Sequence, residues 1–431
     1  MFQAFDFNSR IEDADVLDFV SRNLSKYAIH SSHPGYFGFY NPPSAAMGVF
    51  ADALTAIYNP QLATWNHASF AVAAERHLLR CFGEKFGYSN DSVDGTFTSG
   101  GSEANHTALL AALTNSFPEF DRAGLRAIAG RPVFFVSREG HYTFQKAARA
   151  CGLGTDAVIE IPLGDDYKMD GKELSKAIAA ARRRGDKPFL VVGAVGTTTG
   201  GIIDPLPELA EIAAKEGLWF HVDAAWGGAA ALVPELRGHL SGIERADSIT
   251  FDAHKWLAMP MGAGMFITRH PEILDRTFHV SITFMPSYMP PKRSSDEPDP
   301  YAHSMQWSRR FIGLKIFLAL ATIGWEGYAD VIRHHVAMGE LLKRLLAEHR
   351  WRIINSTPLP VVCFQDESRP DGDDPRHLLE IARRTVTGGK FWISASLIGN
   401  RSVLRACVCN YRTTEDDIRA LVDSLETIRE E

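Results

Sequence analysis

Cysteine is scarce in this sequence, and its arrangement excludes two common uses of the residue. Five cysteines occur among 431 residues. Their number is odd, they are scattered, and none shows the spacing of a zinc site. We therefore expect no disulfide framework and no metal site, and a reducing, cytoplasmic location is the simplest interpretation.

Long apolar segments and a signal core are missing as well. The longest apolar run, Phe311–Trp325, contains Lys315 and is shorter than the roughly 20 residues that span a bilayer. The N-terminal stretch MFQAFDFNSR carries an acid early and has no apolar core of the kind that directs secretion. The run at 311–325 therefore predicts a helix of the protein core, and we expect no membrane partner.

An excess of positive charge is also absent. Lysine and arginine number 45 against 52 acidic residues, and the net charge is −7. The chain thus lacks the basic surface that nucleic acid or an anionic membrane requires. What is present is an ordinary composition, 45% apolar and 23% charged, long enough for one large domain and a smaller one.

After the first third of the chain, strand and helix patterns alternate. Short apolar runs at 133–136, 189–195, 218–222 and 248–251 predict buried strands, and amphipathic stretches such as 206–215 predict helices between them. Repeated units of this length indicate an α/β fold, a mostly parallel sheet with helices on both faces. Polar residues gather after the strands, where ligands bind in such sheets.

These patterns divide the chain into three parts. Residues 1–45 form an N-terminal segment, residues 46–310 a large α/β domain, and residues 311–431 a small C-terminal α+β domain. Within the large domain, residues 278–301 contain several prolines and little periodicity. This pattern is typical of a lid loop, and a plain surface insertion is the alternative.

Four polar positions, at a helix start and at strand ends, need one explanation. Gly101 and Ser102 open a predicted helix, where free N–H groups and the helix dipole can hold an anion, and Ser102 also suits the N-cap. His141 follows one predicted strand and Asp223 follows another. Lys255 follows a third, between an imidazole and an indole, where an amine in an apolar pocket can attack a carbonyl.

Pyridoxal 5′-phosphate would use all four positions. Its aldehyde condenses with a lysine amine, its phosphate suits a helix N-terminus, and its pyridine nitrogen needs a buried carboxylate to stay protonated. Its ring also needs a flat partner on one face and a small one on the other. His141 and Ala225 fit these two roles.

The residues around these positions resemble one family. The stretches HVDAAW at 221–226 and DAHKW at 252–256 are similar to those of the group II pyridoxal-phosphate-dependent amino acid decarboxylases, which include the aromatic L-amino acid and tyrosine decarboxylases. The resemblance implies a fold-type I, transferase-like large domain and a homodimer with shared active sites. It also implies decarboxylation of an L-amino acid, with an aromatic one as the first guess, to the amine and CO₂.

The resemblance assigns a role to each position. Lys255 would carry the Schiff base on the way to a quinonoid intermediate, Asp223 would pair with the pyridine nitrogen, and His141 would stack on the ring. Thr198 would touch the cofactor or Asp223. The phosphate would be held by Gly101, Ser102 and His254.

The lid departs from the family pattern. In the aromatic decarboxylases a lid tyrosine returns the last proton, and counting from Lys255 without gaps puts Phe284 at that position. A shift by four residues puts Tyr288 there, and we favour Tyr288 as the donor because lid loops change register easily. With Phe284 in place, the resemblance would point instead to oxidative deamination that yields an aldehyde.

Two further expectations concern the pocket. An aromatic group would form the substrate wall, or else the edge of a core: Tyr36, Phe37, Tyr40 and Trp65. Asp252 stands where several relatives have asparagine, and we expect it to turn away because a carboxylate beside a phosphate is unfavourable. Besides the aldehyde-forming reaction, another pyridoxal-phosphate-dependent carbon–carbon lyase and a scaffold with a dead site remain as alternatives.

Overall fold

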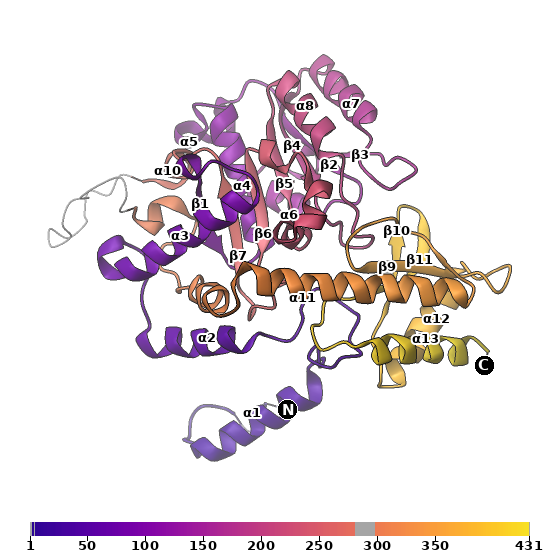
Figure 1. Cartoon of the computed structure of the whole chain (residues 1–431). Coiled ribbons are helices and arrows are strands. Elements are labelled where there is room, and N and C mark those ends of the chain that lie inside the picture. The colour runs from indigo at the N-terminus through magenta and orange to yellow at the C-terminus, as the bar shows by residue number, and fades with distance from the viewer. Residues whose placement is uncertain (1, 4, 281–297, 431) are drawn as a thin grey trace.

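One large sheet organises the molecule. The computed structural model describes residues 2–3, 5–280 and 298–430, and within them this sheet has seven strands in the order β1-β7-β6-β5-β4-β2-β3 (Figure 1). Strands β3, β2, β4, β5 and β6 run parallel, whereas β7 is antiparallel to both β6 and β1. The predicted mostly parallel sheet is confirmed. Its strands are β1 Asp94–Thr98, β2 Pro132–Ser137, β3 Val158–Ile161, β4 Lys187–Ala194, β5 Trp219–Asp223, β6 Ser248–Asp252 and β7 Gly264–Thr268.

Helices cover both faces of this sheet. The core on one face draws its residues from α4, α6 and α10, and the core on the other from α3, α7, α8 and part of α11. The helices are α1 Asp13–Tyr27, α2 Ala46–Tyr58, α3 Ser69–Lys85, α4 Gly101–Ser116, α5 Phe120–Ala123, α6 Thr143–Ala150, α7 Gly171–Arg183, α8 Leu206–Glu216, α9 Pro234–Arg237, α10 Ile273–Phe278, α11 Leu314–Glu348, α12 Pro375–Thr387 and α13 Glu415–Glu430.

The central strands are apolar on both sides. Phe135 and Val191 belong to the core that includes α7 and α8, whereas their neighbours Phe134 and Val192 belong to the core that includes α4 and α6. Successive strand residues point to opposite faces, so a strand covered on both faces reads as a continuous apolar run. This is why the runs in the sequence predicted these strands well.

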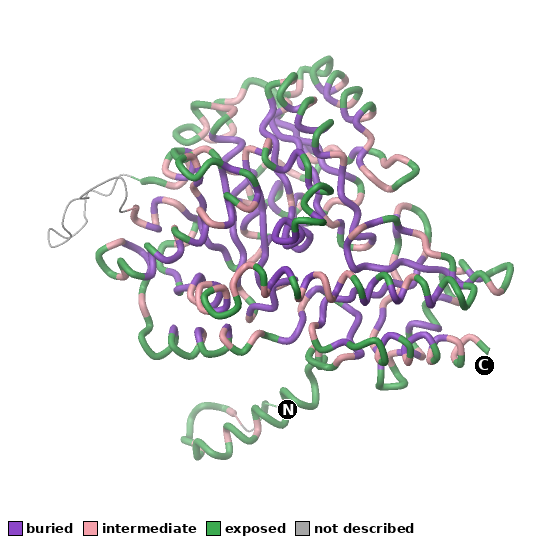
Figure 2. The backbone as a smooth tube through the Cα atoms, viewed as in Figure 1, coloured by how far each residue is buried: buried purple, intermediate pink, exposed green. Residues whose placement is uncertain are grey.

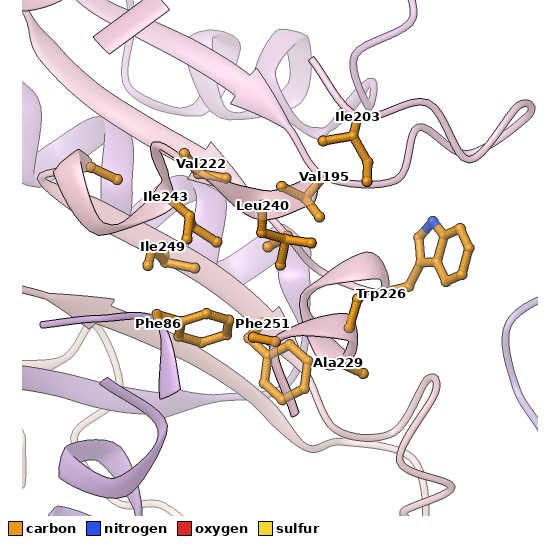
Figure 3. Packing of buried hydrophobic residues seen from close by; sticks show 14 of the residues in the cluster. Phe86, Val195, Ile203, Val222, Trp226, Ala229, Leu240, Ile243, Ile249 and Phe251 are labelled. Atoms are coloured by element: carbon orange, nitrogen blue, oxygen red, sulfur yellow. The ribbon is translucent and has the colours of Figure 1, made fainter. Parts of the chain in front are cut away.

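A packed core fixes the strands that lead into the site. Val222 of β5 and Ile249 and Phe251 of β6 belong to one cluster with Leu240 and Ile243, which follow β5 (Figure 3). Burying side chains of this size contributes about 1.5–3 kcal/mol each. The carboxyl ends of β5 and β6 are therefore held rigidly with respect to each other.

The C-terminal part contains a second, antiparallel sheet in the order β10-β11-β9-β8. Helices α12, α13 and the second half of α11 share one core with this sheet. The structure thus confirms the predicted small α+β part, while its exact limits at 310 and 311 stay a prediction. Its strands are β8 Trp351–Ile353, β9 Val361–Asp366, β10 Ser394–Ile398 and β11 Arg401–Cys407.

Residues 33–40, near the N-terminus, are bound to residues near the C-terminus. Phe37 is fully buried in the core of the small sheet. Its N–H bonds to Trp392 O (2.9 Å), and its carbonyl accepts the N–H of Cys407 (2.9 Å). Asn410 Nδ2 donates to His33 O (2.8 Å). The predicted N-terminal segment is therefore partly built into the small sheet's layer.

The first two helices expose many apolar residues. Helix α1 has no buried residue, and Figure 2 shows α1 and α2 largely in the colour of exposed residues. The exposed apolar residues of α1 and α2 are Leu17, Val20, Leu24, Tyr27, Val49, Phe50, Leu54, Ile57 and Tyr58. No helix in the described parts of the chain combines the length and apolar character needed to cross a membrane.

Helix α11 is longer than predicted. The expected core helix at 311–325 corresponds only to its first third, which is interrupted at Gly324, a residue with φ of 66°. Beyond this break the helix continues to Glu348 and joins the two sheets' cores (Figure 1).

Candidate active site

The carboxyl ends of four parallel strands meet at one edge of the large sheet, where a cavity of about 310 Å³ lies. Asp223 ends β5, and Lys255, His141 and Thr198 come shortly after β6, β2 and β4. The structure brings to the wall of this cavity every residue that the sequence predicted as cofactor-binding: Gly101, Ser102, His141, Thr198, Asp223, Ala225, His254 and Lys255.

One end of the cavity is the N-terminus of α4. The first bond of the helix runs from Glu103 N to Gly100 O (3.0 Å), so the N–H groups of Gly101 and Ser102 precede it. Such N–H groups and the helix dipole form an anion-binding site. Ser102 was predicted as the N-cap, but the N-cap is Gly100, because the helix begins at Gly101, two residues earlier than an N-cap at Ser102 would place it.

Glycines let the chain pack tightly around this helix end. A Cβ atom at Gly101 would lie 2.8 Å from Asp252 Oδ2, and one at Gly264 would lie 2.6 Å from Gly100 Cα. These contacts are closer than real side chains allow. The glycines therefore permit β6, β7 and α4 to approach one another at the anion site.

Lys255 forms an ion pair inside the cavity. Its Nζ lies 3.0 Å from Asp252 Oδ2, and the Asp252 side chain is only 1% exposed. The other oxygen of that carboxylate, Oδ1, is buried and bonds to no residue that the structure describes. The prediction that Asp252 turns away is wrong, because the charge of the lysine compensates a buried carboxylate that would otherwise be strongly unfavourable.

His254 lies between Lys255 and the start of α4. Its Nδ1 accepts the N–H of Ala263 (3.2 Å), and burial lowers the pKa of its imidazole. A neutral ring that accepts at Nδ1 carries its proton on Nε2. That N–H is available as a donor near the anion site, 3.8 Å from Asp252 Oδ2.

The Asp223 carboxylate is fixed by two N–H donors. Asn105 Nδ2 donates to Oδ2 (2.8 Å), and the backbone N–H of Ala225 donates to Oδ1 (3.1 Å). Both oxygens therefore act as acceptors. Hydrogen bonds to a carboxylate favour its charged form, which is the form that stabilises a protonated ring nitrogen.

His141 is oriented by Thr143, two residues further on. The Thr143 N–H donates to His141 Nδ1 (3.2 Å), and the Thr143 hydroxyl lies 3.1 Å from the same atom. The imidazole is thus held at the cavity wall from its Nδ1 side.

These groups fit pyridoxal phosphate. The helix N-terminus suits the phosphate, Lys255 supplies an amine, Asp223 a carboxylate for the ring nitrogen, and His141 a flat partner for the ring. No cluster of three or more His, Cys, Asp or Glu side chains that could hold a metal ion occurs among the described residues.

A match to a protein family identifies the chemistry of this site. The family model of the pyridoxal-dependent decarboxylase conserved domain matches residues 5–367. The chain belongs to the pyridoxal-dependent decarboxylases. It is accordingly a pyridoxal-phosphate-dependent carboxy-lyase that acts on an amino acid.

Curated relatives of this decarboxylase act on chemically different amino acids. It is 28% identical to the aromatic-L-amino-acid decarboxylase of Bacillus atrophaeus, covering 97% of this chain and 85% of that one. It is 29% identical to the L-2,4-diaminobutyrate decarboxylase of Rhizobium meliloti (95% and 81%) and 28% identical to the L-aspartate decarboxylase dtxS4 of Metarhizium robertsii (86% and 73%). The reaction type is therefore shared, whereas the side chain of the substrate is not.

Solved structures agree with the fold of the decarboxylase. Mouse CSAD superposes with a TM-score of 0.91 at 27% identity, over 99% of this chain and 90% of that one. The Oryza sativa TDC structure with PLP and tryptamine gives a TM-score of 0.89 at 26% identity, over 100% and 91%. The fold-type I architecture expected from the sequence is confirmed.

Sequence reasoning missed several residues that build the decarboxylase site. Asn105, Thr143, Glu139 and Trp226 all line the cavity. Arg405 lies one layer behind, where its Nε donates to the carbonyls of Thr198 (3.1 Å) and Thr199 (3.2 Å). An asparagine within the apolar run of α4 was a usable signal, because asparagine is unfavourable in a helix interior unless it has a partner.

The predicted aromatic wall does not line the cavity of a single chain. Tyr40 stacks on Trp226, with ring centroids 4.3 Å apart, and its hydroxyl donates to Thr198 O (2.8 Å), so it lies behind the wall. Tyr36 and Phe37 are buried, the latter in the core of the small sheet. Trp65 packs at a separate small core. The lid positions Phe284 and Tyr288 lie outside the described residues.

Proposed function

We propose that this decarboxylase converts an L-amino acid with an aromatic side chain into the amine and CO₂. Pyridoxal phosphate supplies the electron-withdrawing ring that accepts the electron pair left when CO₂ departs. The observation that carries the proposal is the convergence of Lys255, Asp223 and His141 on one cavity that begins at an anion-binding helix end.

In this proposal each side chain has one task. Lys255 Nζ attaches the cofactor and gives way to the amine of the substrate. Asp223 keeps a proton on the ring nitrogen, because a fixed carboxylate favours the positively charged ring. His141 lies against one face of the ring and Ala225 against the other, while Thr198 contacts the cofactor or Asp223. The phosphate is held by Gly101, Ser102 and His254.

The cavity wall supports an apolar substrate side chain over an acidic one. Trp226, Met261 and Ala194 contribute apolar surface, and among the described residues the cationic groups of the wall are Lys255 and the two histidines already assigned to the cofactor. An acidic side chain would be buried there without a cation of its own, which is unfavourable. The relatives that act on aromatic amino acids agree with this choice.

One observation favours a second candidate, a diamino acid. Glu139 lines the cavity, accepts the N–H of Gly399 (2.8 Å) and pairs with no cation among the described residues. Burial raises the pKa of its carboxyl. A substrate with a second ammonium group would compensate this charge. The relative named L-2,4-diaminobutyrate decarboxylase gives an example of such a substrate.

The final proton decides the product. We propose that Tyr288 returns a proton to the α-carbon, so that the amine forms; if Phe284 occupies that place, oxygen can intercept the electron pair and an aldehyde results. Replacing Tyr288 with phenylalanine and measuring amine, aldehyde and peroxide separates the two. Unchanged amine formation would exclude Tyr288 as the donor.

A homodimer and a cytoplasmic location complete the proposal. The row of apolar side chains on α2 and the unburied α1 provide a surface that a second copy would cover. The five cysteines are all free, including Cys407 and Cys409, whose sulfur atoms are 3.7 Å apart, and this supports a reducing compartment.

The direct test is a substrate panel. Purified protein is loaded with pyridoxal phosphate, and CO₂ release is measured with aromatic, diamino and acidic L-amino acids, with peroxide followed in parallel. We expect release with an aromatic amino acid and no peroxide. Release from none of the amino acids would contradict the proposal, and peroxide in equal amount would assign the aldehyde-forming reaction.

Glu139→Gln separates the two candidate substrates. Because hydrogen bonds to charged groups contribute about 1.5–3 kcal/mol, the variant should lower kcat/KM for a diamino acid about 10- to 100-fold. For an aromatic amino acid kcat/KM should change little. Glu119→Gln, at an exposed position, is the matched control and should leave both values unchanged.

A further inference from the structure

The hydrogen bonds around Asn105 form a chain whose donors and acceptors can be assigned one by one. Both oxygens of Asp223 accept, and Asn105 meets Oδ2 at 2.8 Å. If the Asn105 amide were turned over, its oxygen would face a carboxylate oxygen, and two acceptors would oppose each other. The NH₂ group of Asn105 therefore faces Asp223, and its oxygen faces the other way.

On that other side, the oxygen of Asn105 fixes a buried histidine. Asn105 Oδ1 lies 3.2 Å from His221 Nε2, so this nitrogen carries a proton. Burial lowers the pKa of His221 to about 4, which keeps the ring neutral and leaves Nδ1 as an acceptor. Nδ1 then takes the hydroxyl proton of Ser248 (2.8 Å), and Ser248 in turn accepts the N–H of Trp219 (2.9 Å).

Thr250 is the remaining polar neighbour of this histidine. Its hydroxyl oxygen lies 3.3 Å from His221 Nε2 and can share the same proton as an acceptor. The chain therefore runs in one direction, from Trp219, which can only donate, to Asp223, which accepts at both oxygens. Every buried polar atom along it has a partner, as buried networks require.

A second branch leaves Asn105 toward the opposite side of the cavity. The second hydrogen of its NH₂ group goes to the Thr143 hydroxyl oxygen (3.0 Å). That hydroxyl, having accepted, gives its own proton to His141 Nδ1 (3.1 Å), which also receives the Thr143 backbone N–H (3.2 Å). His141 therefore carries its proton on Nε2, the ring nitrogen that faces away from Thr143.

We propose that Asn105 is a positioning residue that sets the protons on both sides of the cofactor site. With one amide it binds Asp223 Oδ2 and turns the Thr143 hydroxyl proton toward His141 Nδ1, where this hydroxyl reinforces the bond from the Thr143 backbone N–H and helps keep the proton of His141 on Nε2. The inference rests on the proposed function in that the cofactor ring lies between Asp223 and His141. It goes further by naming the group that links them.

This assignment limits what His141 can do. A neutral imidazole with its proton on Nε2 offers one hydrogen-bond donor to the cavity and no acceptor, because Nδ1 is already occupied by Thr143. It can therefore hold an acceptor, such as a carboxylate oxygen of an amino acid, against the ring. It cannot act as a base toward the substrate while Thr143 donates to it.

The first test reads the proton positions directly. Nitrogen NMR of the pyridoxal-phosphate-loaded protein with ¹⁵N-labelled histidine distinguishes a nitrogen that carries hydrogen from one that does not. The signals of His141 and His221 are assigned by their loss in His141→Gln and His221→Gln. We expect both rings to be neutral with hydrogen on Nε2. Hydrogen on Nδ1 of His141 would overturn the inference.

The second test asks whether Asn105 acts through Thr143. Residues that hold a catalytic group in place typically account for about 10- to 100-fold in activity, so Asn105→Ala and Thr143→Val should each lower kcat by a factor of this size with little change in KM. The double variant should lose less than the product of the two losses, because both cut one chain. Losses that multiply would overturn the proposal.

A control variant and the NMR readout keep the outcomes distinct. Asn115→Ala removes an exposed asparagine from the same helix and should change neither kcat nor the histidine signals. If Asn105→Ala does not fold, Thr143→Val still tests what the hydroxyl adds to the His141 signal beyond the backbone N–H, which the variant keeps. If no amino acid releases CO₂ but His141 carries its proton on Nε2, the proposed function fails and the proton assignment stands. If CO₂ is released but His141 carries its proton on Nδ1, only the proton assignment is refuted.

Discussion

At the scale of single residues, Lys315 shows how a buried charge supports the site from outside it. Its side chain is 5% exposed, and its Nζ lies 3.3 Å from Asp52 Oδ1 on α2. The same nitrogen donates to the carbonyls of Pro260 and Met261 (3.3 Å each) and Gly262 (3.5 Å). Lys315 thereby fixes the segment that follows Lys255 and carries Met261 at the cavity wall.

We expect Lys315→Met to lower the free energy of unfolding by about 3 kcal/mol, because it removes a buried cation that binds three backbone carbonyls and leaves Asp52 with the half-exposed Arg310 alone. Denaturant unfolding measures this loss. Arg310→Met is the matched control, since Arg310 pairs with the same Asp52 at 3.3 Å but is half exposed, and it should cost less than about 1 kcal/mol. Equal losses would show that burial of Lys315 is irrelevant.

The sequence predicted the residues of the site better than the contacts among them. Lys255, Asp223 and His141 were found because each follows an apolar run at a place where parallel strands converge. Asn105 was not singled out, since its partners lie far away in the chain and only the folded packing brings them together. Asp252 was misjudged for a related reason: it does lie beside the anion-binding start of α4, but the fold also brings the Lys255 amine to 3.0 Å from its carboxylate.

At the scale of elements, the strand pair β6–β7 carries the anion end of the site. β7 begins at Gly264, which lies opposite Asp252 in the antiparallel pairing. A Cβ atom there would lie 2.5 Å from Thr98 Oγ1 and 2.6 Å from Gly100 Cα. Three elements therefore meet at a point where only a glycine fits.

Gly264→Ala should lower the free energy of unfolding by about 1–3 kcal/mol and weaken pyridoxal phosphate binding, because the added methyl group pushes Gly100 away from the start of α4. Titration of the cofactor-free protein with pyridoxal phosphate measures the second effect. Gly238→Ala is the control, since a Cβ atom at Gly238 meets nothing within 4 Å. Unaltered cofactor affinity in Gly264→Ala would contradict this view of the β7 start.

Two elements were not predicted from the sequence: the antiparallel strand β7 and the second half of α11. Parallel strands are recognisable in the sequence because a crossover helix separates each from the next. An antiparallel partner such as β7 needs no helix before it and leaves no such pattern. The second half of α11 was missed because Gly324 reads as a helix end in the sequence. In the structure, Gly324 only interrupts a helix whose apolar face continues onto the small sheet.

At the scale of the whole molecule, buried histidines determine the response to acid. Burial lowers the pKa of His221 to about 4 and that of His335 to about 3. In the unfolded chain each would titrate near 6.5, so between that pH and the folded value the unfolded state binds more protons, and stability falls as pH falls. Asp204, whose pKa burial raises to about 6, has the opposite sign below pH 6.

Each of the two histidines should therefore lower the free energy of unfolding by up to about 1.4 kcal/mol per pH unit as pH falls from 6 to 4, and Asp204 should offset one of them. Denaturant unfolding at pH 6, 5 and 4 gives the slope. His335→Gln keeps an acceptor for the Trp256 N–H (2.9 Å in the native protein) and should flatten the slope. His239→Gln, at an exposed position, should not; a slope equally steep in His335→Gln would refute the assignment.

Association of two copies is the other prediction at this scale. Ile57 on α2 is 75% exposed, and Ile57→Glu would place a charge in the surface that we propose a second copy covers. Light scattering should give twice the 47.6 kDa chain mass for the native protein and a lower mass for this variant. Leu379→Glu, which changes a similarly exposed apolar residue on α12, should leave the mass unchanged. A native protein of single-chain mass would end the dimer proposal.

The bonds between residues 33–40 and residues 392–410 have a consequence for biosynthesis. Phe37 leaves the ribosome early, yet the groups that receive it, Trp392 and Cys407, are made only near the end of translation. Until those residues are made, the apolar Phe37 side chain has no core in which to bury and stays exposed to solvent. Because these groups lie within about 40 residues of the C-terminus, the small layer can be completed only at the end of synthesis.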